Sequence, residues 1–112
     1  MARRFSRKSQ DFIKALARLG YAFIPGRGDH VKAQFITNCA DGAPFKFLFP
    51  IDRGEIPPGT FHAILAQAGG LSEEQLGQAL DGTFTEADYR QMIATKSREE
   101  LLRLTRGRRF GR

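Results

Sequence analysis

Tryptophan is absent from the 112 residues of this chain, and cysteine occurs once, at Cys39. A single cysteine cannot form an intramolecular disulfide, and no cysteine and histidine pair has the spacing of zinc ligands. The sequence therefore indicates neither a disulfide scaffold nor a metal site. A reducing cytoplasm is the expected location.

Long apolar runs are missing as well. No stretch approaches the roughly 20 residues that a membrane-spanning helix needs. The basic segment 1–8 is followed by Asp11, Lys14 and Arg18 instead of the apolar segment of a signal peptide. We therefore expect no membrane association.

The net charge of +6 is unevenly distributed. Residues 1–8 carry four basic and no acidic side chains, residues 96–112 carry seven basic and two acidic ones, and residues 9–95 carry seven basic and ten acidic ones. Contacts with phosphate are therefore expected from the two ends and from a few individually placed cations. The alternative is that the basic ends only keep a small protein soluble.

The first half of the chain begins with a helical pattern. Apolar side chains recur at helical spacing over residues 10–19, with Ser9 as the expected N-cap and Gly20 as the expected end. Residues 21–24 then predict a short strand, and a turn rich in proline and glycine follows it.

Two further strands and a second helix follow. Residues 30–36 alternate as a strand, and residues 45–49 predict another strand, which we expect Pro50 to end, after a polar loop over 37–44. A second helix is expected to open within residues 55–60 and to stop at two glycines.

This order predicts an α+β fold with an α-β-β-β-α arrangement, in which two helices cover one face of a three-stranded antiparallel sheet. Strand alternation divides the side chains between the two faces of that sheet. The expected buried set is Val31, Phe35, Phe45, Phe47 and Phe49. The expected open set is His30, Lys32, Gln34, Lys46 and Leu48.

Extra helices are expected beyond this unit. Residues 72–75 fit a capping box, Asp81-Gly82 is a break, and residues 85–88 and 97–100 each resemble a helix start. The added helical segment can dock on the domain or on a protein partner. The predicted organisation is a basic arm over 1–8, a main domain over 9–80, and a helical extension with a basic tail over 81–112.

Chemistry is restricted to few residues. A catalytic serine elbow, a P-loop and paired metal carboxylates are all missing, which leaves the histidines His30 and His62. RNA cleavage suits so sparse a site, because the 2′-OH of the substrate is the nucleophile and the protein needs only proton transfer and charge stabilisation. His30 follows a glycine turn, Lys32 shares its strand face, and Arg27 lies across the turn. His62 has no such cation neighbours and is expected to be an ordinary surface or boundary residue.

Three segments form a distinctive series along the chain. They are Asp11-Phe12-Ile13 with Leu19-Gly20-Tyr21, then Gly28-Asp29-His30, and then Glu55-Ile56-Pro57-Pro58-Gly59-Thr60-Phe61 with Ile64-Leu65-Ala66-Gln67-Ala68-Gly69. Over about residues 9–76 this series resembles the HicA family of mRNA interferase toxins.

The resemblance implies a double-stranded-RNA-binding-like fold and a ribosome-independent endoribonuclease that acts on mRNA, the toxin of a type II toxin-antitoxin system with a HicB antitoxin as partner. The family's catalytic histidine ends a Gly-Ser-His motif and maps onto His30. The residues and the resemblance together predict His30 as the catalytic residue and Arg27, Gly28, Lys32 and Lys46 as RNA-binding residues, with no metal and no cofactor.

Two departures from the family pattern stand out. Asp29 replaces the serine before the histidine, and its carboxylate would repel a phosphate unless it points away, as strand alternation permits. Family members often have a second histidine two residues after a proline, where this chain has Pro50-Ile51-Asp52. These acidic residues support the alternative of a non-catalytic module of the same fold that binds RNA or a protein partner.

Overall fold

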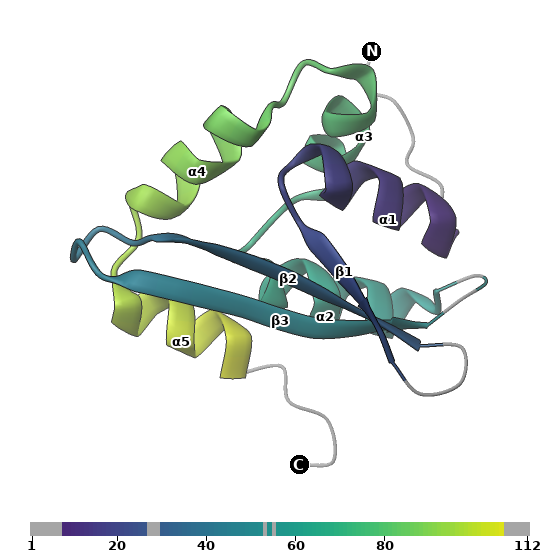
Figure 1. The fold of residues 1–112 in the computed structure, drawn as a ribbon, viewed down its shortest axis with the longest axis horizontal. Coiled ribbons are helices and arrows are strands. Elements are labelled where there is room, and N and C mark those ends of the chain that lie inside the picture. Colours follow the sequence, from purple (N-terminus) through teal and green to yellow (C-terminus); the bar gives the residue numbers. More distant parts are fainter. Residues whose placement is uncertain (1–7, 27–29, 53, 55, 107–112) are drawn as a thin grey trace.

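The computed structural model describes residues 8–26, 30–52, 54 and 56–106. Within them the chain forms one helix, then three strands, and then four helices (Figure 1). The elements are α1 (Ser9–Arg18), β1 (Ala22–Pro25), β2 (His30–Asn38), β3 (Pro44–Asp52), α2 (Pro58–Gln67), α3 (Glu73–Asp81), α4 (Glu86–Ala94) and α5 (Arg98–Arg106). The predicted α+β class is confirmed, and so are the extra helices after α2.

The three strands form an antiparallel sheet in the order β1-β2-β3. β3 runs on through Pro50 to Asp52, so the expectation that Pro50 ends the strand is wrong. An edge strand tolerates proline because one side of it makes no ladder hydrogen bonds. The two long strands also extend into the expected loop, which leaves residues 39–43 as the connection.

One face of the sheet is buried and the other is open. Ala33, Phe35, Phe47 and Phe49 are almost completely buried, and so are Phe45 and Ile51. The alternate positions Lys32, Lys46, Leu48 and Pro50 are exposed. The predicted phase of the alternation is therefore confirmed, although Val31 at the edge of the core is only half-buried.

Helices α1 and α2 pack together on the buried face. The rings of Phe12 and Phe61 meet edge to face, with 5.4 Å between their centroids. Ser9 is the first residue of α1 and not its cap, because Lys8 occupies the N-cap position and Ser9 is buried, with its backbone N–H donating to the Gly54 carbonyl at 2.7 Å. α2 ends at two glycines with positive φ, as the sequence predicts.

The starts of α3 and α4 are fixed locally. Ser72 and Gln75 form a complete capping box at α3, and Thr85 and Asp88 form another at α4. Between the two helices Gly82 adopts the left-handed conformation with φ +85°. Each capped start stabilises its helix by about 1 kcal/mol, so these boundaries follow from short-range sequence.

α4 lies across the ends of α1 and α2, and three of its residues make the contact. Tyr89 and Ile93 are completely buried. Ile93 reaches over Gly69, at which an added Cβ would lie 2.6 Å from the Ile93 Cδ1 atom. Glu86 likewise lies over Gly20. The glycines that end α1 and α2 are therefore also the positions that let α4 approach.

A buried hydrogen-bond chain ties α4 to the rest of the core. The Tyr89 hydroxyl donates to the Ala68 carbonyl at 2.6 Å, and the two tyrosine hydroxyls of Tyr21 and Tyr89 lie 2.7 Å apart. Because the single proton of Tyr89 goes to the carbonyl, Tyr21 must be the donor between the two hydroxyls. Burial raises the pKa of Tyr21, and the neighbouring Tyr89 raises it further; burial also raises the pKa of Tyr89.

α4 also protects an open edge of the sheet. β1 pairs with residues 31–34 of β2, and no other described strand lies beside the rest of that edge. Arg90 donates from Nη1 to the Ile36 carbonyl at 3.2 Å, and its guanidinium lies 4.6 Å from the Phe35 ring centroid. Covering an unpaired edge removes a template for strand pairing with another chain.

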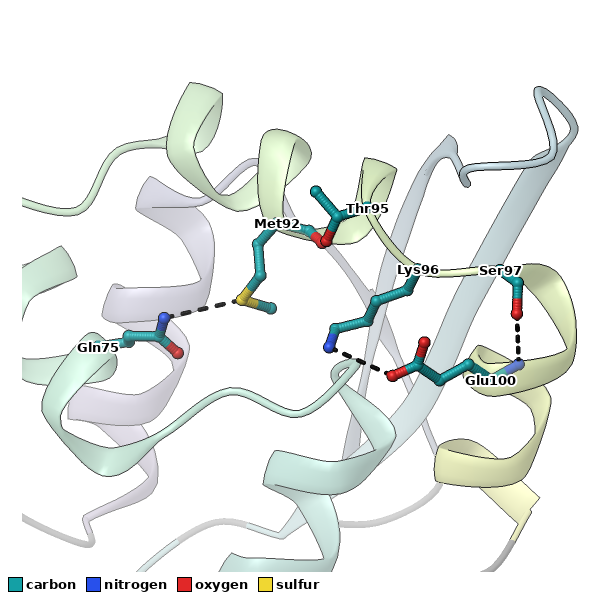
Figure 2. Close-up of polar contacts among 6 residues, drawn as sticks. All are labelled: Gln75, Met92, Thr95, Lys96, Ser97 and Glu100. Carbon is teal, nitrogen blue, oxygen red and sulfur yellow. Dashed lines mark hydrogen bonds and ion pairs between the residues drawn. The ribbon is translucent and has the colours of Figure 1, made fainter.

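Polar contacts hold α4 against α3 and secure its connection to α5 (Figure 2). Gln75 of α3 donates to the Met92 sulfur at 3.7 Å. The Ser97 hydroxyl accepts from the Glu100 backbone N–H at 3.1 Å, and Lys96 pairs with the Glu100 carboxylate at 3.7 Å. Leu101 then enters the core completely. The extension therefore docks on the domain, one of the two possibilities that the sequence left open.

Candidate nucleic-acid interface

The open face of the sheet is built in rows by the strand register. One row holds Ile24, Lys32 and Pro50, the next holds Ala22, Gln34 and Leu48, and a third pairs Ile36 with Lys46. We call these eight residues the open sheet face. These side chains point outward because alternate residues of a strand lie on opposite faces of the sheet. Ala33 and Phe35 are buried in the core, so their neighbours on β2 lie on the open side.

Two cations lie on this face. Lys32 and Lys46 are both exposed, and neither makes an ion pair with another residue that the structure describes. They are four residues apart along the ladder and on adjacent strands, which separates them by about 14 Å. No carboxylate belongs to the three rows, so this surface favours an anionic ligand.

His30 is the first residue of β2, at the end of the same face. Strand alternation gives its position the same parity as that of Lys32, and the two positions are about 7 Å apart along the strand. The register places His30 opposite Asp52 of β3, the position at which the family pattern often has a histidine. Of these two residues the structure describes only the backbone. The sheet therefore brings position 30 beside Lys32, while Lys46 lies further along the ladder.

The remaining predicted site residues divide into two groups. Arg27 and Gly28, with Asp29, lie outside the described residues. His62 is exposed on α2, which confirms its expected surface position, and its ring meets that of Phe61 edge to face.

Apolar side chains complete the open sheet face. Ile24, Ile36 and Leu48 are 42%, 49% and 48% exposed, and they are the large hydrophobic residues that the described part of the chain leaves in water. The sequence places Leu48 and Ile36 on this side of the sheet. Ile24 could be found only from the register, because a four-residue strand is too short to fix its own phase.

Other site types find no support in the described part of the chain. No group of three or more histidine, cysteine, aspartate or glutamate side chains there could hold a metal ion. None of the helices described is long and apolar enough to cross a membrane.

The fold is that of a small α+β domain with one sheet face covered by helices and the other open, and the lysines of the open face make no ion pair with the residues that the structure describes. Residues 9–69, more than half of the chain, match the family described as HicA toxin of bacterial toxin-antitoxin systems. The chain therefore belongs to the HicA toxin family, and membership implies an antitoxin partner. No curated protein and no solved structure matches the chain.

The family match ends at Gly69, so α3, α4 and α5 lie beyond it. Tyr89, Ile93 and Leu101 from these helices nevertheless belong to the same buried cluster as Phe12 and Phe47. One core thus holds both the family segment and the extension.

Proposed function

We propose that the chain is an endoribonuclease toxin that cleaves mRNA, with His30 as its proton-transfer residue. Lys32 and Lys46 hold the RNA backbone along the open sheet face, and Arg27 and Gly28 of the preceding turn complete the phosphate contacts. The observation that carries the proposal is the combination of HicA family membership with a sheet face whose lysines have no ion-pair partner among the described residues.

The chemistry asks little of the protein. The 2′-oxygen of a ribose attacks the adjacent phosphorus, the bond from phosphorus to the 5′-oxygen breaks, and a 2′,3′-cyclic phosphate and a 5′-hydroxyl end result. His30 takes the 2′-OH proton as a general base, and the leaving 5′-oxygen takes a proton from solvent water. Lys32 stabilises the negative charge that develops on the phosphoryl oxygens. No metal or cofactor is required by these steps.

A pair of histidine variants tests the proposal. Expression of the unchanged chain is expected to arrest growth and degrade RNA, and His30→Ala is expected to abolish both effects. His62→Ala is the matched control, because His62 is an exposed helical residue remote from β2 in sequence, and it should remain as toxic as the unchanged chain. Equal toxicity of the His30→Ala variant and the unchanged chain would rule out the catalytic role.

The alternative function is a non-catalytic module that binds RNA or a protein partner. The observation in its favour is the register of β2 and β3, which sets Asp52 opposite His30, so that an acidic residue faces the proposed catalytic position. Purified protein that binds RNA in a salt-dependent way, yet leaves it intact over hours, would favour this module over the nuclease.

A HicB-like antitoxin is the proposed protein partner. Its neutralising effect can be measured by co-expressing the chain with any small protein encoded beside its gene, and an antitoxin is expected to restore growth. A neighbouring protein that does not bind the purified chain would be ruled out as the antitoxin.

A further inference from the structure

Gln34 occupies the centre of the open sheet face. In the register it lies between Ala22 of β1 and Leu48 of β3, at distances of about 5 Å between Cβ atoms. Lys32 precedes it by two residues on the same strand, and Lys46 is its diagonal neighbour on β3, so each lysine lies about 7 to 8 Å from it. The amide is therefore flanked by both cations of the face.

The Gln34 side chain is half-buried, and its amide makes no hydrogen bond with any other residue that the structure describes. An amide group offers two N–H donors and one acceptor oxygen. At an interior position such a group would need partners within the protein, but here it faces the surface beside the exposed side chain of Leu48. The face thus presents one neutral donor and acceptor pair between two phosphate-binding cations.

We propose that Gln34 determines the sequence specificity of the nuclease by hydrogen bonding to the edge of an unpaired base, while Leu48 and Ile24 contact the apolar face of bases beside it. This inference rests on the proposed function. Lys32 and Lys46 neutralise RNA phosphates on the two sides of Gln34, so the RNA strand runs along β2 and its bases turn toward the sheet. Base edges are hidden in an RNA duplex, and the substrate is therefore single-stranded over this position.

The charge of the face selects RNA over a second copy of the chain. Two copies that met through these rows would bring Lys32 and Lys46 together with like charges and no carboxylate to compensate them. An RNA strand supplies negative charge for the lysines and base edges for Gln34 in one molecule.

The experiment maps cleavage sites. RNA containing a randomised segment is cut with the unchanged protein, and the new 5′ ends are sequenced to give the base preference at each position around the cut. Gln34→Ala and Gln34→Met, which keeps the side-chain length without the amide, are expected to lower the preference at one position by about tenfold. Gln91→Ala is the matched control, because Gln91 is an exposed glutamine on α4, and it should leave the preference unchanged.

A parallel binding measurement separates this inference from the nuclease proposal. Labelled oligomers of A, C or U are titrated with the same proteins, and the ratio of their dissociation constants is compared. An unchanged protein that cuts no RNA but binds these oligomers with a base preference, which Gln34→Met removes, would refute the nuclease and support the role of Gln34. A cleavage profile or affinity ratio that is the same in the Gln34 variants as in the unchanged protein would overturn the inference. So would binding by the unchanged protein without any base preference.

Discussion

The hydrogen-bond chain from Tyr21 through Tyr89 to Ala68 gives the sharpest test of how α4 is held. Tyr89→Phe keeps the ring, so no cavity is created, but the Ala68 carbonyl loses a donor and the Tyr21 hydroxyl loses its acceptor. Each buried polar group left without a partner costs about 1 to 3 kcal/mol. With two such groups, the free energy of unfolding is expected to fall by about 2 to 6 kcal/mol.

The donor-to-acceptor direction of these hydrogen bonds makes the expected loss of stability different for the two tyrosines. Tyr21→Phe removes only the donor to Tyr89, which keeps its own bond to Ala68, so the expected loss is about 1 kcal/mol. In the double variant only the Ala68 carbonyl lacks a partner, and the loss is expected to be smaller than the sum of the two single losses.

Urea unfolding followed by circular dichroism measures these differences, and Thr95→Ala is the control. The Thr95 hydroxyl is exposed and donates only within its own helix, to the Met92 carbonyl, so its removal should cost no more than about 0.5 kcal/mol. If Tyr89→Phe lowers the free energy of unfolding no more than the control does, the buried hydrogen bonds of Tyr89 are refuted. A Tyr21→Phe loss larger than that of Tyr89→Phe would refute their direction.

Three further predictions concern the same packing. Folding raises the pKa of both tyrosines, so the unfolded chain releases their protons first as the pH rises through about 10. The free energy of unfolding should therefore fall above that pH by up to about 1.4 kcal/mol per pH unit for each tyrosine. A double phenylalanine variant with an equally steep decline would contradict this cause. Gly69→Ala should lower the free energy of unfolding by about 2 to 4 kcal/mol, because it adds a steric clash with Ile93 to the strain of a positive φ. Gly42→Ala has only the strain and should cost about 1 to 2 kcal/mol. Equal losses in urea unfolding would argue against a close approach by α4. A chain that ends after residue 82 should aggregate or lack a cooperative thermal transition, since it loses the core residues Tyr89, Ile93 and Leu101. A folded monomer by circular dichroism and gel filtration would show that the extension is dispensable.

The part of the fold that depends on near neighbours could be predicted from the sequence. The alternation around Phe35 fixes which face Lys32 and Gln34 occupy, because a one-residue change of phase would bury a lysine. The capping residues Ser72 and Thr85 fix two helix starts, since the hydrogen bonds of a capping box span only three residues. The cations around His30 made it a candidate, the resemblance to the HicA family strengthened that candidate, and its catalytic role stays a prediction.

Contacts between distant segments were decided only by the tertiary structure. Nothing in the spacing around Tyr21 indicates a partner 68 residues away, because a hydrogen bond between buried hydroxyls depends on how α4 is placed over the sheet. The continuation of β3 through Pro50 likewise depends on its being an edge strand, and strand order is not written in the local pattern. The sequence by itself determined the order of the helices and strands and the buried faces of β2 and β3, whereas the packing of the core decided that the extension closes the fold and leaves one basic face open.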